Sequence, residues 1–211
     1  MSKLYIVGIG PGSADFVTPA ARKAVKRSQI IIGSERALEL FPEAREVLPL
    51  SVHNIQEKLE YAVEMAKQKK DVCVLSTGDP GFSGILSPIK RIIQEKNYID
   101  LEIEVIPGIS SIQLCAARAE IPWDKADLLS FHGNENLQEI LAIIDNGRPT
   151  IALPYGNSTD TAQFLIKQGI DPLRQVTICE KLSYEAEKIV QSTLQEVAKT
   201  DFSYMCVMII H

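Results

Sequence analysis

Three glycine-rich loops carry the residues best suited to hold a small ligand. Gly8-Ile9-Gly10-Pro11-Gly12 and Ser76-Thr77-Gly78-Asp79-Pro80-Gly81-Phe82-Ser83-Gly84 each follow an apolar run, and Pro107-Gly108-Ile109-Ser110-Ser111 follows a third. Because glycine lacks a Cβ, backbone N–H and C=O groups can approach a ligand there. Asp79 can accept from an ammonium or hydroxyl group. The loops therefore predict recognition of a small polar molecule by backbone atoms, although an Asp-Pro-Gly turn without a ligand explains the second loop equally well.

The first loop also invites comparison with a dinucleotide-binding turn, with Glu35 near the place of a ribose-binding acid. Two features oppose that interpretation. Ser13 stands where the third glycine belongs, and Pro11 removes a backbone donor. The cap of the next helix is expected at Thr18, too far along the chain to hold a pyrophosphate at the loop. An NAD(P)-dependent oxidoreductase using Gly8–Gly12 remains an alternative, as does a tight turn that binds nothing.

Short apolar runs that alternate with amphipathic segments must position these loops. This alternation predicts a mostly parallel α/β sheet, with strands at residues 4–8, 30–32, 72–75 and 101–106. A helix is expected over 54–69, with Asn54 and Glu57 forming a capping box. Another should start at Thr18-Pro19, because proline suits the first helical position. A third is expected to start near Ser110 or Ser111.

The periodic pattern of apolar residues stops around Ile121-Pro122-Trp123-Asp124. This break predicts a linker between two α/β domains, residues 1–120 and 121–211. The first domain carries the glycine-rich loops. In the second, a hairpin is expected within 181–193, and the other expected elements are strands at 128–131, 150–153, 176–179 and 205–210 with helices at 137–144 and 159–167.

Composition excludes several classes of function. A formal net charge of -5 and 23% charged residues argue against an extended nucleic-acid footprint. The four cysteines are widely spaced and lack metal-ligand or redox spacing, so no metal is expected and the thiols should be reduced. Neither a signal peptide nor a membrane-spanning run is apparent. We therefore expect a cytoplasmic protein that binds neither nucleic acid nor membrane.

Taken in order and spacing, several motifs resemble the signature of the tetrapyrrole (corrin/porphyrin) methylase family: Gly8-x-Gly10-x-Gly12, Thr18-Pro19-Ala20-Ala21, Gly78-Asp79-Pro80 and Pro107-Gly108-Ile109-Ser110-Ser111. The resemblance covers essentially the whole chain. It implies a two-domain α/β fold with a mostly parallel N-terminal sheet and a mixed C-terminal sheet. It also implies a homodimer that binds S-adenosylmethionine in the cleft between the domains and releases S-adenosylhomocysteine.

Within that family, further segments resemble the branch that methylates C-5 of cobalt-precorrin-7 in cobalamin biosynthesis: Ile31–Arg36, Leu129–Gly133, Glu180–Tyr184 and Glu187–Val190. One departure is Asn134, where the branch usually has a basic residue after His-Gly. Some relatives carry a second domain that methylates C-15 and decarboxylates an acetate arm, so a separate partner is implied for that step. Another family substrate remains an alternative: an earlier precorrin, a modified protein histidine or ribosomal RNA.

The resemblance also assigns site residues. Cofactor contacts are expected at Pro11, Gly78, Asp79, Gly81, Phe82, Ser110, Ser111, Tyr155, Leu182 and Ser183. The substrate carries many carboxylates, so a few cations should bind it; the candidates are Arg22, Arg36, Arg118, His132 and Lys181. His132 is the one candidate catalytic group, as a donor or base. No strong nucleophile is needed, because the sulfonium is an activated methyl donor.

Overall fold

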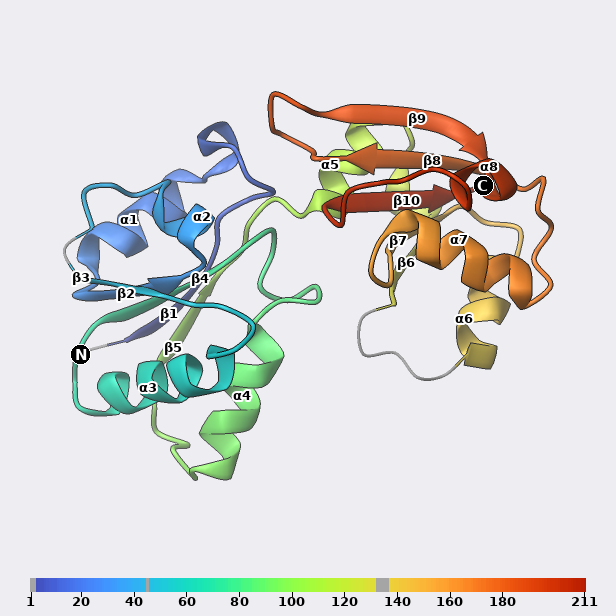
Figure 1. The fold of residues 1–211 in the computed structure, drawn as a ribbon. Coiled ribbons are helices and arrows are strands. Elements are labelled where there is room, and N and C mark those ends of the chain that lie inside the picture. Colours follow the sequence, from blue (N-terminus) through green and yellow to red (C-terminus); the bar gives the residue numbers. More distant parts are fainter. Residues whose placement is uncertain (1–2, 45, 132–136) are drawn as a thin grey trace. The chain divides into compact units, whose positions relative to one another are not determined.

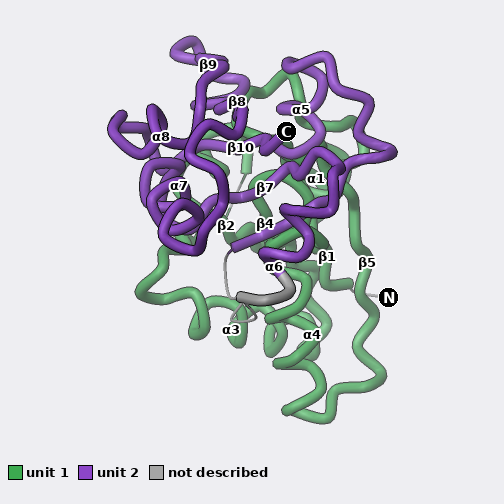
Figure 2. Tube along the Cα trace, turned by 90° about the vertical axis from the view of Figure 1, so that its right-hand side faces the viewer, with its two compact units in different colours: residues 1–110 green, residues 111–211 purple. Residues whose placement is uncertain are grey.

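The computed structural model describes residues 3–44, 46–131 and 137–211. The chain divides into two compact units, residues 1–110 and 111–211, coloured separately in Figure 2. The division precedes the linker expected at 121–124, because helix α5 (Ser111–Arg118) packs against strands β7 (Thr150–Leu153) and β10 (Cys206–Ile210) of the second sheet.

The first unit is built on a five-stranded parallel sheet with strand order β3-β2-β4-β1-β5 (Figure 1). Its strands are β1 (Leu4–Gly8), β2 (Ile30–Gly33), β3 (Glu46–Pro49), β4 (Val72–Ser76) and β5 (Ile103–Ile106). The four strands predicted from sequence are confirmed. The edge strand β3 is additional, and its Val47 is 44% exposed, so it lacks the apolar run that marks the buried strands.

Helices cover both faces of this sheet, because successive strand side chains point to opposite faces. Leu4 and Ile6 face α3 (Ile55–Lys67) and α4 (Leu86–Glu95). Tyr5 and Val7 face α1 (Pro19–Arg27) and α2 (Glu35–Leu38). Figure 1 shows the two helix layers on either side of the strands.

Of the two helix starts predicted for this unit, the cap at Thr18 is confirmed and the capping box at Asn54 is not. Thr18 caps α1 as expected: its hydroxyl accepts from Ala21 N at 3.1 Å, with Pro19 in the first turn. The capping box at Asn54 and Glu57 is wrong, because the Asn54 side chain makes no cap hydrogen bond to α3. Its Oδ1 instead accepts from the backbone N–H of Ser51 at 2.7 Å and closes the preceding turn.

The second unit contains a mixed sheet with strand order β6-β7-β10-β8-β9, where β6 spans Asp127–Ser130, β8 spans Gln175–Glu180 and β9 spans Lys188–Thr193. Strand β10 is antiparallel to both β7 and β8, and β6 is parallel to β7. Strands β6, β7 and β8 therefore run in the same direction and end at the same edge. The hairpin is formed by β8 and β9, so only its second strand lies within the predicted segment.

Helices α6 (Leu137–Ile144), α7 (Ser158–Lys167) and α8 (Leu194–Val197) share one core with the second sheet, whose largest members include Phe131, Ile144 and Met208. Short 3-10 turns lie at Ala14–Phe16 in the first unit and Trp123–Lys125 in the second. Among the described residues, no helix has the length and apolar character required to cross a bilayer.

Candidate functional site

The order of the first sheet creates a switch point between β1 and β4. The chain leaves β1 for α1 on one face of the sheet, and it leaves β4 for α4 on the other face. Parallel sheets place ligands beyond the carboxyl ends of strands where neighbouring connections diverge in this way. The loops after β1 and β4 are the glycine-rich loops singled out from the sequence.

Direct hydrogen bonds join these two loops. Gly78 N donates to Gly10 O at 2.8 Å, Gly10 N donates to Gly78 O at 3.4 Å, and Ile9 N donates to Ser76 O at 3.0 Å. Gly10 has φ +85° and Gly78 has φ +70°, a left-handed conformation that glycine adopts without steric cost. The two loops thus form one connected backbone layer at the sheet edge.

The third loop packs against this layer through glycine. A Cβ on Gly108 would lie 2.2 Å from Gly78 O, and one on Gly8 would lie 2.4 Å from Gly108 N. Gly84 is similarly restricted, since its Cβ would lie 2.6 Å from Pro80 O. Most glycines here serve the close packing of the protein's own backbone rather than leaving open space for a ligand.

Asp79 joins two of the loops with its carboxylate. Its Oδ1 accepts from Gly81 N at 2.8 Å, which confirms the Asp-Pro-Gly turn, and its Oδ2 accepts from Gly108 N at 3.1 Å. Each oxygen accepts one backbone N–H, so Asp79 fixes the shape of the loop edge. A carboxylate has further acceptor sites, so the ligand contact expected of Asp79 from the sequence stays a prediction.

Gly81 is the glycine whose surroundings suit a ligand. The nearest atom to a Cβ built there is the Asp79 carboxylate Oδ1, at 3.1 Å. The residue is exposed, and it lines a hollow of about 430 Å³ together with Leu86, Ser87, Lys90, Arg91 and Gln94. Such open backbone fits a small cofactor held by main-chain groups, as the resemblance implies, and Phe82 follows directly with a partly buried side chain.

The remaining candidates of the first unit lie on the same sheet edge. Pro11 follows the bridged Gly10 and is buried, and Ser110 follows Gly108. Arg36 lines a second hollow of about 550 Å³ beyond the carboxyl ends of β2 and β3. Arg22 is already engaged: its Nη2 donates to Ala14 O at 3.1 Å, and its guanidinium lies 5.9 Å from the Phe41 ring centroid.

The dinucleotide alternative loses support from the same geometry. The first loop continues into the 3-10 turn at Ala14–Phe16, and α1 begins only at Pro19. The Thr18 hydroxyl already satisfies an N–H at that helix start. Helix α1 therefore begins beyond this 3-10 turn and not directly at the Gly8–Gly12 turn, where a pyrophosphate site would require its N-terminus.

The other candidates lie in the second unit. Tyr155 follows β7, and Lys181, Leu182 and Ser183 follow β8, so these four share the carboxyl edge of that sheet. Tyr155 is 67% exposed, whereas Leu182 is 5% exposed. Ser111 begins α5 and is separated from Ser110 by the division between units. His132 falls outside the described residues.

Arg118 and Glu187 form an ion pair beside the candidate residue Ser183. Arg118 Nε lies 2.6 Å from Glu187 Oε1, and Ser183 N donates to Glu187 Oε2 at 2.6 Å. Arg118 was expected to bind substrate, but part of its guanidinium is engaged with this carboxylate. Glu187 was absent from the predicted site. The signal that could have indicated it is a carboxylate four residues after a candidate loop serine.

Comparisons with known proteins identify the family of the chain. Residues 3–198 match the family described as Tetrapyrrole (Corrin/Porphyrin) Methylases. The chain is 40% identical over 208 residues to a probable cobalt-precorrin-7 C(5)-methyltransferase of Methanocaldococcus jannaschii, covering 98% of this chain and 96% of that protein.

Solved structures show the same fold. A cobalamin-biosynthesis precorrin-6Y methylase from Archaeoglobus fulgidus has a TM-score of 0.74 at 26% identity, covering 99% of this chain and 97% of that one. A uroporphyrin-III C-methyltransferase from Thermus thermophilus, complexed with S-adenosylhomocysteine, has a TM-score of 0.78 at 21% identity, covering 99% and 97%. With its fold and nearly its whole sequence matched, the chain belongs to the tetrapyrrole (corrin/porphyrin) methylase family.

Proposed function

We propose that the protein transfers the methyl group of S-adenosylmethionine to C-5 of the corrin ring of cobalt-precorrin-7 during cobalamin biosynthesis. The observation that carries this proposal is the 40% identity, over 98% of the chain, to the probable C(5)-methyltransferase of Methanocaldococcus jannaschii. The backbone edge at the β1/β4 switch point supports it, because its exposed Gly81 suits a small cofactor.

When bound, S-adenosylmethionine supplies an already activated methyl group. The chain's residues therefore need to hold and orient the cofactor and the ring, and no side chain has to attack the methyl group. In the first unit, Pro11, Gly78, Gly81, Phe82 and Ser110 provide the cofactor contacts, while Asp79 keeps the loops in shape. In the second unit, the proposed contacts are Ser111, Tyr155, Leu182 and Ser183.

Substrate recognition falls to a few cations, because the chain as a whole is acidic, with a net charge of -5. Arg36 is the leading candidate in the first unit, since it lines the larger hollow at the sheet edge. Lys181 is the candidate in the second unit, beside the proposed cofactor residues. His132 is proposed to take the ring proton after methyl transfer or to donate to the substrate.

We further propose that the enzyme works as a homodimer in the cytoplasm and that a separate protein methylates C-15 and decarboxylates the acetate arm. The Methanocaldococcus jannaschii relative supports a separate protein for the C-15 step, because that relative is matched over 96% of its length and is named for C(5) alone.

Methyl transfer can be followed directly. We expect incubation with cobalt-precorrin-7 and S-adenosylmethionine labelled with ¹³C in its methyl group to place one labelled methyl at C-5, seen by mass spectrometry and NMR of the ring. Label on an earlier precorrin, with none on cobalt-precorrin-7, would overturn the assignment of substrate. Binding of NADH without binding of S-adenosylmethionine, measured by calorimetry, would overturn the assignment of reaction class.

A further inference from the structure

The connection between β8 and β9 contains an unusual backbone. Lys181 has φ +49° and Ser183 has φ +71°, and residues other than glycine seldom occupy this left-handed region. Such residues persist when their surroundings hold them in place. Backbone hydrogen bonds fix one end of the connection, where Lys181 N donates to Met205 O at 2.8 Å.

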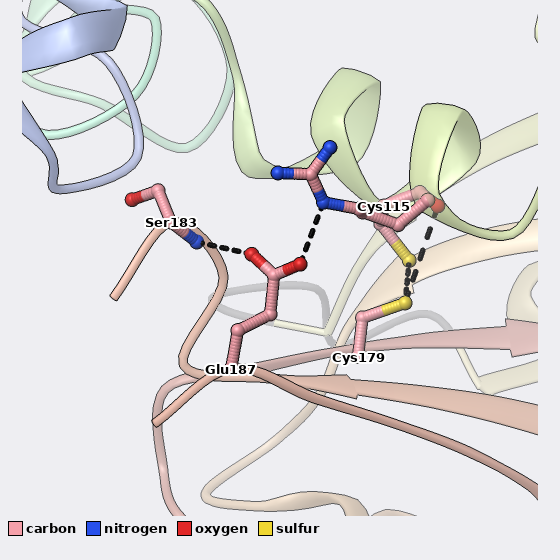
Figure 3. Close-up of polar contacts among 5 residues, drawn as sticks. Cys115, Cys179, Ser183 and Glu187 are labelled. Atoms are coloured by element: carbon pink, nitrogen blue, oxygen red, sulfur yellow. Dashed lines mark hydrogen bonds and ion pairs between the residues drawn. The ribbon is translucent and has the colours of Figure 1, made fainter. Parts of the chain in front are cut away.

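Glu187 holds the middle of the connection. Its Oε2 accepts from Ser183 N at 2.6 Å, and its Oε1 lies 2.6 Å from Arg118 Nε on helix α5 (Figure 3). The Glu187 side chain is 21% exposed, so water competes only partly for these charge-assisted hydrogen bonds. One carboxylate therefore links the Ser183 backbone to a helix.

Helix α5 gives this link a fixed base. It packs on β7 and β10, and its Cys115 Sγ lies 2.8 Å from Cys179 Sγ on β8, with both thiols buried (Figure 3). Cys115 and Arg118 are one helical turn apart, so α5 contacts β8 through the first and Glu187 through the second. Leu182, between the two left-handed residues, is 5% exposed.

We propose that Glu187 is a positioning residue that holds the Leu182–Ser183 backbone in the conformation required for cofactor binding, with Arg118 as its fixed counter-ion. The inference rests on the proposed function, in which Leu182 and Ser183 contact the cofactor. Arg118 then acts through Glu187 rather than as a separate anchor for a substrate carboxylate.

The test compares Glu187→Ala, Glu187→Gln, Arg118→Ala and the Glu187→Ala/Arg118→Ala double variant with the unaltered protein. Asp145→Ala is the matched control, because it removes an ion pair of the same unit, Arg174 Nη1 to Asp145 Oδ1 at 3.1 Å, that lies outside this connection. The readouts are the calorimetric Kd for S-adenosylhomocysteine, the kcat and KM of methyl transfer, and hydrogen exchange of the Ser183 amide in the ligand-free protein.

Glu187→Ala should raise the Kd and the KM for the cofactor about tenfold, with kcat at saturation changed less than about threefold, as expected when one charge-assisted hydrogen bond is lost. Ser183 amide exchange should speed up by about the same factor. Glu187→Gln should recover much of the affinity, because its amide oxygen can still accept from Ser183 N. Arg118→Ala should add little to Glu187→Ala in the double variant, and Asp145→Ala should leave cofactor affinity unchanged.

The outcomes separate the two proposals. Unaltered protein that binds no S-adenosylhomocysteine would overturn the proposed function, and the cofactor role of Glu187 would fall with it. Binding by the unaltered protein together with equal binding by Glu187→Ala would overturn the positioning role alone. Unchanged hydrogen exchange of the Ser183 amide in Glu187→Ala would show that Glu187 does not hold this backbone. Fully additive effects of Glu187→Ala and Arg118→Ala on the Kd would show that the two residues act independently.

Discussion

At the scale of single residues, Asp79 and Glu187 play similar parts in different units. Each is a carboxylate whose two oxygens hold groups from two segments: Asp79 holds the N–H groups of Gly81 and Gly108, and Glu187 holds Ser183 N and Arg118 Nε. Acidic residues beside a candidate cofactor loop are easily interpreted as ligand acceptors. Asp79 fixes the shape of the loop edge in the first unit, and Glu187 is proposed to do the same for the β8–β9 connection.

Replacing Asp79 should therefore affect stability as well as binding. Asp79→Ala leaves two N–H groups without their acceptor, so the free energy of unfolding should fall by about 1–3 kcal/mol and S-adenosylmethionine should bind more weakly. Asp79→Asn keeps one acceptor oxygen, so its stability and its affinity for S-adenosylmethionine should lie between those of the unaltered protein and those of Asp79→Ala. Chemical denaturation and calorimetry measure the two effects, with the exposed Asp100→Ala as control. Weaker binding at unchanged stability would show that Asp79 contacts the ligand directly.

At the scale of elements, the ends of strands β1, β4 and β5 determine the site of the first unit. Their loops meet at the Gly78 carbonyl oxygen, which a Cβ on Gly8 would approach to 2.7 Å and a Cβ on Gly108 to 2.2 Å. Gly81 stands apart, because it is exposed beside a hollow. These glycines thus divide into those that pack loops together and one that leaves space.

Substitution by alanine distinguishes the two kinds of glycine. Gly108→Ala places a methyl group 2.2 Å from Gly78 O, and the forced shift of the loops should lower the free energy of unfolding by about 3 kcal/mol. Gly81→Ala should change that energy by less than about 0.5 kcal/mol yet weaken S-adenosylmethionine binding. Thermal or urea unfolding and calorimetry check both variants. A stable Gly108→Ala protein, or full affinity in Gly81→Ala, would contradict this division.

Much of this architecture could be predicted from the sequence. Strands with uninterrupted apolar runs and the Thr18-Pro19 helix start were predicted because local patterning determines them. Edge strands β3 and β9 were harder to identify, since neither contains a fully buried residue. Helix α4 went unpredicted, because Pro88 in its first turn interrupts the expected pattern although the position tolerates it.

The candidate loops could be located from the sequence, but their contacts could not. Gly108 lies far along the chain from Gly8, and only the order of the parallel strands brings them together. The same holds for Arg118 and Glu187, which meet because α5 lies on the sheet that carries the β8–β9 connection. Such pairings depend on sheet order, which local spacing does not encode.

At the scale of the whole molecule, each unit buries its own core, and the cysteines belong to these cores. All four are free and buried. Burial raises the pKa of Cys73 and of Cys206 above the ordinary thiol value. Contact with the Cys179 thiol, together with burial, raises the pKa of Cys115. These groups should stay protonated at neutral pH.

The rate at which the cysteines react with a disulfide reagent should therefore measure unfolding of the protein. Because only the thiolate attacks a disulfide reagent, the folded protein at pH 8 should react with an aromatic disulfide about 100-fold or more slowly than free glutathione does. In denaturant, four thiols per chain should titrate rapidly. A fast phase in the folded protein would reveal an accessible cysteine, and a total of two in denaturant would reveal a cross-link.

The position of β10 in the second sheet has a consequence for biosynthesis. This strand lies between β7 and β8, yet it follows every other strand of its sheet in the chain. During synthesis the β6–β7 pair and the β8–β9 hairpin emerge before Cys206–Ile210, the strand that joins the two pairs in the folded sheet. We therefore expect the second unit to complete its sheet late, with the facing edges of β7 and β8 unpaired and open to aggregation until then.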